Sequence, residues 1–369
     1  MRDKLNILMF CAALAGFLLI VTAFPRDART LELENREFRK RPALTAENLL
    51  GGELDGQFEA YVSDRVGYRA SFTARALEYG GFYGLPSENG ARLDGTLLSF
   101  SDRLVEIFTY SEAGARDYAD ALNRYRAALG ENVRVFSLIA PTQLEFLPEL
   151  YRSVSDSQLA AIRAVNARLS GITPVDAYAS IMAHAEEYVY FRTDHHWTAL
   201  GAYYAYRAYA DAAGFEPLGL EEYEAGHLEG FLGYLYNQAP SDGMEQNPDT
   251  LTYYAYKGAL TTSEKLLVLP SAGEKVLYSV FLGGDHAIYE LRTSVKNGKT
   301  AVIIKGSYAN AFIPWIAPHY ENIVVLDPRA FEGSAIEKIA EYGDVDLIFL
   351  NYVLSTSFDD FIIKLDGMR

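Results

Sequence analysis

From residue 113 onward, short apolar runs alternate with amphipathic segments, and this alternation limits the folds open to the chain. The apolar runs, which are typical of strands buried on both faces, lie at residues 133–140, 300–305, 322–326 and 345–350. Helical periodicity predicts helices at residues 113–129, 155–169, 200–213, 334–342 and 358–365. Gly130 and Gly214 directly follow two of these and are expected C-caps. Strands that alternate with helices predict an α/β fold, with a parallel sheet flanked by helices on both faces.

The composition is that of a folded, acidic protein. The chain has 369 residues, of which 50% are hydrophobic and 22% charged, and its formal net charge at pH 7 is -16. This size suffices for one large domain or two ordinary ones. The negative charge repels phosphate backbones, so we expect no nucleic-acid partner. The single cysteine, Cys11, lies in the N-terminal apolar segment, so we expect neither a disulfide nor a thiolate metal site in the folded part.

The amino terminus carries an apolar segment that predicts a membrane anchor or a signal peptide. Residues 7–24 contain no charge, follow Arg2 and Lys4, and end before Pro25. Their length is close to the ~20 residues that span a bilayer, and the preceding basic residues favour a cytoplasmic amino end. We prefer an uncleaved anchor, with a cleaved signal peptide as the alternative. The rest of the chain is then extracytoplasmic and anchored to the cytoplasmic membrane, or secreted if the segment is cleaved.

These patterns divide the chain into three parts. Residues 1–25 form the predicted signal anchor or signal peptide, and the polar residues 26–95 predict an N-terminal helical extension packed on the core. Residues 96–369 hold the α/β alternation, with an irregular insertion near 226–296 that is rich in Tyr, Gly and Asp turns. In such a sheet the site lies at the carboxyl ends of the strands.

The segment Asp194-His195-His196-Trp197 is the first candidate site. In an extended chain residues two apart share a side, so Asp194 and His196 are natural partners and His195 faces away. A carboxylate that accepts a hydrogen bond from an imidazole fixes its tautomer and favours the imidazolium. One alternative makes Asp194 a helix N-cap with exposed histidines. The other is an Asp-His-His metal site, but no further ligand cluster accompanies these residues, so we expect no metal.

Ser307 is the second candidate, between the predicted strand at 300–305 and a predicted helix at 308–316. A serine at such a junction exposes its hydroxyl at the end of the sheet, where N–H groups of the helix start can stabilise an oxyanion. Gly306 permits the sharp turn. The alternative is a serine that only caps the helix. The two sites complement each other, because one supplies an oriented base and the other a nucleophile that lacks one.

Together the two segments resemble the DHHW protein family and the alginate O-acetyltransferases, which have an SGNH-hydrolase-like domain. Asp194-His195-His196-Trp197 looks like the DHHW signature, and Ser307-Tyr308-Ala309-Asn310 is similar to the family's serine segment. Further similar pieces lie at residues 34–36, 64–65, 282–286 and 318–320. The resemblance extends over most of the chain after the apolar segment and implies an SGNH-hydrolase-like fold.

The resemblance implies a triad in which Asp194 is the acid, His196 the base and Ser307 the nucleophile, with no cofactor. The family more usually has an aspartate before the serine, where this chain has Gly306. It also implies that the chain O-acetylates a surface or exported polysaccharide, with acyl groups supplied by a membrane-bound O-acyltransferase. Two alternatives remain, a carbohydrate esterase with the same triad and a non-catalytic polysaccharide-binding or scaffold protein.

Six further residues are candidates for holding the oxyanion or the substrate: Gly283, Gly284, Gly306, Asn351, Trp197 and Tyr308. Backbone donors at the Ser307 turn and at the two glycines of residues 283–284 suit an oxyanion. Asn351, at the end of the strand at 345–350, is a third donor, or else a turn or cap residue. Trp197 can shield the histidine from water, and Tyr308 adjoins the nucleophile.

Overall fold

The computed structural model of the protein describes residues 92–94 and 96–369. The predicted anchor or signal peptide (1–25), nearly all of the predicted helical extension (26–95), and the family-like pieces at 34–36 and 64–65 lie outside the described residues and stay predictions. Within the described ranges, no helix is both long and apolar enough to cross a bilayer. Residues 93–235 and 242–369 form one compact unit, which contains the main sheet.

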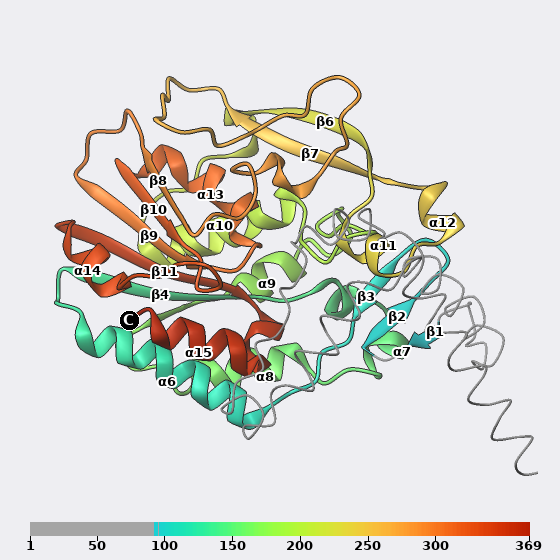
Figure 1. Ribbon diagram of the computed structural model, residues 1–369, viewed down its shortest axis with the longest axis horizontal. Helices are drawn as coiled ribbons and strands as arrows, with labels where there is room; N and C mark the ends of the chain where they lie inside the picture. The colour runs from blue at the N-terminus through green and yellow to red at the C-terminus, as the bar shows by residue number, and fades with distance from the viewer. Residues whose placement is uncertain (1–91, 95) are drawn as a thin grey trace, which may run out of the picture. The chain divides into compact units, whose positions relative to one another are not determined.

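A six-stranded sheet in the order β5-β4-β11-β9-β10-β8 forms the centre of this unit (Figure 1). Its strands are β4 (Val133–Ala140), β5 (Thr173–Val175), β8 (Ile288–Arg292), β9 (Lys299–Lys305), β10 (Asn322–Leu326) and β11 (Asp344–Tyr352). Neighbouring strands pair in parallel, except that β8 runs antiparallel to β10. The predicted α/β architecture with a central parallel sheet is confirmed, except for the antiparallel edge strand β8.

The four strands that were predicted from apolar runs occupy the middle of the sheet. There both faces are covered, so the sequence reads as a continuous apolar run. The edge strands β5 and β8 were not predicted, because they are short and partly exposed. In β8, for example, Glu290 and Arg292 are accessible to solvent. This strand falls inside the segment 226–296, which the sequence predicted to be irregular.

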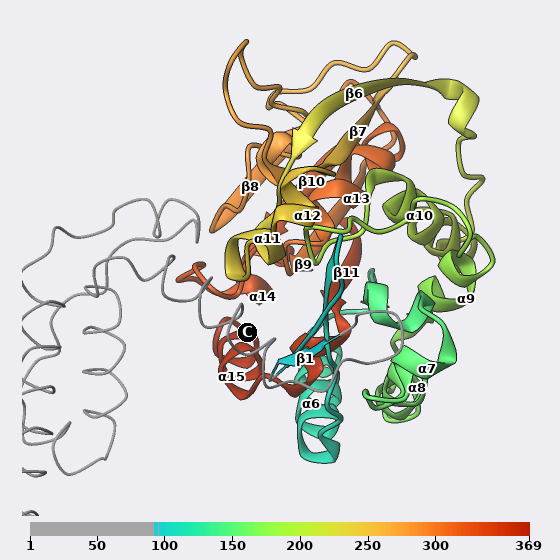
Figure 2. The same cartoon turned by 90° about the vertical axis from the view of Figure 1, so that its right-hand side faces the viewer.

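Helices cover both faces of the sheet (Figure 2). One face carries α9 (Ala177–Met182), α10 (Ala199–Ala213) and α13 (Ala309–Ile316). The other carries α6 (Glu112–Ala128), α8 (Gln158–Asn166), α14 (Ala335–Ala340) and α15 (Asp359–Gly367). Alternate strand residues enter the two cores, so that in β4 Leu138 packs in the α10 core and Ile139 in the α6 core.

The ends of the helices follow local capping chemistry. Ser111 caps α6 and Thr198 caps α10, each by accepting a hydrogen bond from a backbone N–H of the first turn. Gly214 closes α10 in the left-handed conformation, as predicted. The prediction for Gly130 is wrong, because α6 already ends at Ala128 and the extended backbone of Leu129 leads the chain away.

The remaining described strands and α-helices lie outside the main sheet. They are β1 (Arg92–Asp94), β2 (Leu97–Ser99), β3 (Leu104–Glu106), α7 (Glu149–Arg152), β6 (Tyr223–Phe231), α11 (Tyr234–Gln238), α12 (Asp242–Glu245) and β7 (Asp249–Tyr256). β1, β2 and β3 form a three-stranded sheet, and β6 pairs antiparallel with β7. The N–H of Leu104 in β3 donates to the carbonyl of Arg192, 3.2 Å away, which brings β3 beside the Asp-His-His segment.

Candidate active site

Ser307 lies where β9 ends and the chain turns into α13. Lys305 pairs with Leu350 of β11, and the N–H of Gly306 donates to the carbonyl of Leu350 over 3.0 Å, so the turn continues the sheet for one more residue. The side chain of Ser307 is partly exposed. It does not cap α13, whose cap position is Tyr308 and has no side-chain cap. The hydroxyl is therefore left for chemistry at the carboxyl edge of a parallel sheet, where such sites lie.

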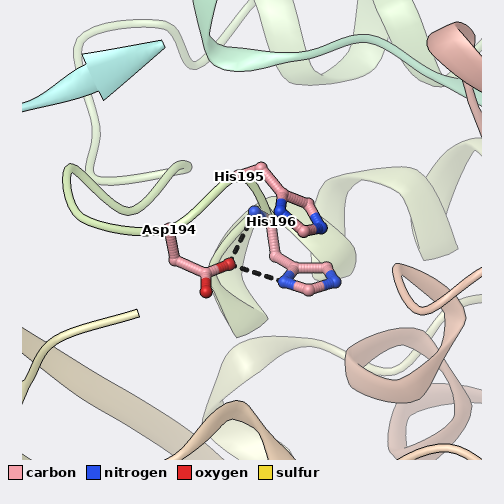
Figure 3. A group of neighbouring side chains, drawn as sticks. All are labelled: Asp194, His195 and His196. Carbon is pink, nitrogen blue, oxygen red and sulfur yellow. Dashed lines mark hydrogen bonds and ion pairs between the residues drawn. The ribbon is translucent and has the colours of Figure 1, made fainter. Parts of the chain in front are cut away.

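Asp194, His196 and Ser307 are joined by a chain of hydrogen bonds. Nδ1 of His196 lies 2.5 Å from Oδ1 of Asp194, and Nε2 of His196 lies 2.7 Å from Oγ of Ser307. Figure 3 shows the carboxylate pointing at the near nitrogen of the His196 ring. Asp194 does not cap α10, since Thr198 does. This arrangement lets His196 exchange a proton with Ser307 while Asp194 holds the tautomer that keeps Nε2 available.

The loop that carries Asp194 and His196 is bent, not extended. Residues 192–196 form consecutive bends between the isolated bridge residues Tyr190 and Trp197. The expectation that His195 faces away is therefore wrong. Its ring lies 4.0 Å, between centroids, from the ring of His196, and both imidazoles stand on the same side of the loop (Figure 3).

Asp249, at the start of β7, holds this loop in place and was missed by the sequence reasoning. Its carboxylate is buried and accepts hydrogen bonds from the N–H of Thr193 (2.8 Å), from the hydroxyl of Thr193 (2.6 Å) and from Nε of Arg192 (3.0 Å). Thr193 and Asp249 are 56 residues apart in sequence. A lone aspartate in a Pro-Asp-Thr sequence gives no signal for such a role.

Asp194 stays ionised although its side chain is only 3% exposed. Burial by itself raises the pKa of this carboxyl, but the charge and hydrogen bond of His196, the charge of His195 and the N–H of Tyr234 outweigh burial and hold the pKa below its usual range. The N–H of Tyr234 donates to Oδ2 over 2.7 Å, and the N–H of His196 donates to Oδ1 over 2.9 Å. A fixed negative charge beside His196 favours the imidazolium during proton transfer.

Tyr278 covers the face of the His196 ring. The two rings are parallel within 6°, and their centroids are 3.8 Å apart. Tyr278 belongs to a short 3₁₀ helix, Tyr278–Val280, in the predicted insertion, and both rings are buried. A stacked ring fixes the orientation of the imidazole and limits its access to water. No feature of the sequence marked Tyr278 for this position.

Hydrogen bonds of Trp197 and Tyr308 join the Asp194–His196 loop to the turn at Ser307. The indole N–H of Trp197 donates to the carbonyl of Tyr308 over 2.9 Å, and the hydroxyl of Tyr308 donates to the carbonyl of His195. Both side chains are fully buried. Their side-chain polar groups are thus already used, so these two side chains hold the site together and neither is free to donate to an oxyanion.

The backbone donors predicted for the oxyanion differ in availability. The N–H of Gly306 is bonded to Leu350, and that of Gly284 donates to the carbonyl of Phe281 over 3.1 Å, so neither is free for this role. Gly283 makes no backbone N–H hydrogen bond within the described part of the chain. Its φ of 78°, like the 106° of Gly284, is in the left-handed region that favours glycine.

Asn351, in β11, lies next to Gly306 in the turn before Ser307. It is fully buried, and its Nδ2 donates to the hydroxyl of Tyr118 over 2.9 Å. Its Oδ1 accepts no hydrogen bond from the described residues, and a Cβ added to Gly306 would lie 3.5 Å from it. Asn351 is thus next to the turn, but one of its amide hydrogens is engaged by a core tyrosine. This placement supports the turn more directly than it serves an oxyanion.

An ionic network around the buried Lys305 anchors both the Gly283-Gly284 loop and the Ser307 turn. Lys305 is 1% exposed and contacts Asp285 and, at 3.4 Å, Asp327. Asp285 also accepts from Nδ2 of Asn310 over 2.8 Å and pairs with Arg329 at 2.7 Å. Burial raises the pKa of Asp285, but Lys305 and Arg329 outweigh it and keep the carboxyl ionised. The strand end, the loop and the start of α13 are therefore held by the same charges.

The donor atoms of Asp194, His195 and His196 lie within 4.8 Å of one another, close enough for a metal ion. Both ring nitrogens of His196 and Oδ1 of Asp194, however, are already in the hydrogen-bonded chain. A metal at this position would have to break that chain. The residues fit a proton-transfer site better than a metal site.

Comparisons with known proteins identify the family. A family model described as DHHW protein matches residues 85–326. The structure is similar to that of a DHHW family protein from Eubacterium siraeum DSM 15702, with a TM-score of 0.68 and 30% sequence identity over 77% of this chain and 97% of that chain. It is also similar in fold to Bacillus cereus PatB1 with a sulfonyl adduct, with a TM-score of 0.58 and 20% identity over 72% of this chain and 97% of that chain. No curated protein matches the sequence. Since the family match spans well over half of the chain, this protein belongs to the DHHW protein family.

Proposed function

We propose that this protein is an extracytoplasmic serine acyltransferase of the SGNH-hydrolase-like type. In this proposal Ser307 receives an acyl group and passes it to a hydroxyl of a polysaccharide. The resemblance to alginate O-acetyltransferases implies that this acyl group is acetyl. The observation that carries the proposal is the continuous hydrogen-bonded chain from Asp194 through His196 to Ser307. We refer to these three residues as the proposed triad.

The first half of the reaction acylates Ser307. Nε2 of His196 accepts the hydroxyl proton while Oγ of Ser307 bonds to the acyl carbonyl carbon, and the carbonyl oxygen becomes an oxyanion. The N–H of Gly283 is the candidate donor for that oxyanion, because the other two glycine N–H groups that were predicted for this role, those of Gly284 and Gly306, are already bonded. Collapse breaks the bond to the leaving group, which takes the proton from His196.

The second half transfers the acyl group. A hydroxyl of the acceptor gives its proton to Nε2 of His196 and bonds to the acyl carbon. Collapse then breaks the bond to Oγ of Ser307, which takes the proton back. With water in place of the hydroxyl, the same steps make the protein an esterase, so exclusion of water from the acyl-enzyme decides between the two activities.

The membrane arrangement belongs to the proposal as well. An uncleaved anchor at residues 1–25 keeps the main domain next to the outer face of the cytoplasmic membrane, where a membrane-bound O-acyltransferase can supply acyl groups. Fractionation of the full chain, followed by protease treatment of intact cells stripped of their wall, tests this. Recovery of the main domain in the cytoplasm would overturn the arrangement.

Hydrolysis of p-nitrophenyl acetate and labelling by a sulfonyl fluoride test the triad in the full chain. We expect Ser307→Ala and His196→Ala each to lower hydrolysis by ~10³-fold or more. The exposed Ser170→Ala is the matched control and should behave as wild type. Mass spectrometry should find the sulfonyl group on Ser307. A wild-type protein that neither hydrolyses the ester nor reacts at Ser307 would instead favour a non-catalytic, polysaccharide-binding role.

A further inference from the structure

A second pair of ionisable side chains, Glu106 and His195, lies beside the proposed triad and takes no part in its proton transfers. Glu106 ends β3, the strand that the hydrogen bond from Leu104 to Arg192 fixes next to the bent loop. His195 is the loop residue whose ring stands next to that of His196. Sequence reasoning gave Glu106 no function and considered His195 only as a possible metal ligand.

The hydrogen bond from Leu104 to Arg192 brings the segments of the two side chains together, and their charges act on each other. Burial raises the pKa of the Glu106 carboxyl, and the charges that modify this effect come from His195 and Asp194. Burial and the charge of His196 lower the pKa of His195, and Glu106 is the first group to oppose this. A ring nitrogen of His195 also lies within 4.8 Å of a nitrogen of His196 and an oxygen of Asp194. A group bound by His195 is therefore next to the base of the proposed triad.

Each of the two side chains has a buried polar atom with no partner in the described part of the chain. These atoms are Oε2 of Glu106 and Nδ1 of His195. A buried polar atom without a partner is unfavourable, so each of the two atoms is suited to a hydrogen bond from or to a ligand. A carboxyl oxygen and an imidazole nitrogen are suited to hydroxyl groups, which both donate and accept hydrogen bonds.

Aromatic rings surround the same position. The ring of His195 meets Tyr234 edge to face, with centroids 4.9 Å apart, and lies nearly parallel to Tyr352 at 6.0 Å. Tyr234 is 40% exposed, which is high for a large ring. Exposed aromatic faces beside a few polar groups are what a sugar requires, because a sugar ring has apolar C–H faces and hydroxyl edges.

We propose that Glu106, His195 and Tyr234 form the subsite for the acceptor, a neutral sugar whose hydroxyl attacks the acyl-enzyme. This inference rests on the proposed function and adds the acceptor's class and position to it. Oε2 of Glu106 accepts a hydrogen bond from one sugar hydroxyl, His195 binds a second, and Tyr234 packs on the ring. A neutral sugar is specified because the ionised Asp194 and the net charge of -16 disfavour an acidic one. The pair moves no proton, since His196 accepts the one that the attacking hydroxyl loses.

Partition of the acyl-enzyme between sugar and water tests the subsite. The full chain is incubated with p-nitrophenyl acetate and cellopentaose, and acetylated oligosaccharide and free acetate are quantified in the same reaction. Loss of folding or of the triad lowers both products and leaves their ratio unchanged, whereas loss of acceptor binding lowers the ratio. We expect Glu106→Leu and His195→Phe each to lower the ratio at least tenfold, and Glu106→Gln, which keeps an acceptor oxygen, to restore part of it.

The controls separate this inference from the proposed function. Glu131→Gln removes an exposed carboxylate that precedes β4, away from the carboxyl ends of the strands, and should keep the wild-type ratio. An unchanged ratio in Glu106→Leu and His195→Phe would overturn the subsite, and so would a wild type that hydrolyses the ester through Ser307 but acetylates no cellopentaose. A wild type that neither hydrolyses the ester nor reacts at Ser307 would refute the proposed function, and the subsite with it.

Discussion

The surroundings of Asp194 and Glu106 shift the pKa values of these two carboxyls in opposite directions. Asp194 receives two backbone N–H bonds and a histidine, which together keep its pKa below the usual range in spite of burial. Glu106 lacks such donors for Oε2, and burial keeps its pKa raised. The same residue type is therefore a fixed charge in one place and a group that holds its proton more tightly in the other.

The raised pKa of Glu106 predicts a pH-dependent cost in stability. A carboxyl that holds its proton more tightly when folded contributes no penalty at low pH and destabilises the fold as the pH rises above its unfolded pKa of about 4.3. We therefore expect Glu106→Gln to gain stability relative to wild type between pH 4 and pH 7. Denaturant unfolding of both proteins across this range checks it. A difference that stays constant with pH would show that the folded pKa is not raised.

Tyr278 offers a prediction about the base. Its parallel stack on His196 should contribute about 0.5–1.5 kcal/mol, so Tyr278→Leu should lower kcat for p-nitrophenyl acetate about 2- to 10-fold. Tyr278→Phe keeps the ring and should lose less. The comparison uses kcat and KM measured separately, since a loss of ring orientation affects kcat. Equal losses in both variants would mean that the hydroxyl, and not the ring, is what matters.

At the scale of the element, the turn from β9 into α13 presents Ser307 without a strained backbone. Gly306 was expected to permit a sharp turn, but it is not among the residues with positive φ, so the turn does not use the conformational freedom of glycine. A Cβ there would meet only Oδ1 of Asn351, at the ordinary contact distance of 3.5 Å. The turn is stabilised by the bond to Leu350 and by the buried Lys305, so it does not depend on glycine.

Gly306→Ala should therefore stabilise the protein. The substitution restricts the unfolded chain without clashing in the folded one, which typically gains about 0.4–1 kcal/mol. The matched control is Gly214→Ala, which should lose about 1–2 kcal/mol because Gly214 closes α10 with a φ of 77°. The measurement is the free energy of unfolding in denaturant. A loss of stability in Gly306→Ala would show that the turn does require glycine.

For the molecule as a whole, long-range contacts assemble the site from separate segments. His196 and Ser307 are 111 residues apart in sequence, and so are Trp197 and Tyr308, which join the same two segments. Lys305 adds two further segments by its contacts with Asp285 and Asp327. The proposed nucleophile, the proposed base and the candidate oxyanion loop are thus held by one connected set of polar contacts.

Removing the central charge of this set should destabilise the whole unit. Lys305→Met leaves the buried carboxylate of Asp327 short of a partner, and loss of a buried partner typically costs about 3–5 kcal/mol. Lys296→Met is the matched control, because Lys296 pairs with Glu321 at the exposed surface and such pairs contribute at most about 1 kcal/mol. Thermal and denaturant unfolding compare the two variants. Similar small losses in both would show that Arg329 alone suffices to balance Asp285 and Asp327.

The sequence by itself determined the central strands, most of the helices and the residues of the proposed triad. Strands such as β4 and β11 are buried on both faces and so consist of long apolar runs, and local caps mark the helix ends. Asp194 and His196 are close in sequence, so their pairing follows from local geometry. The residue types around Ser307 and the family resemblance supplied the third member.

Only the tertiary structure decided which groups surround the triad and which donors remain free. Asp249, Tyr278 and Glu106 reach the site from segments whose spacing in sequence carries no information about their distance in space. The bend that turns His195 toward His196, and the hydrogen bonds that occupy the N–H groups of Gly306 and Gly284, depend on neighbours from other strands and loops. Local propensity acts over a few residues, whereas these contacts form only when the sheet brings its carboxyl ends together.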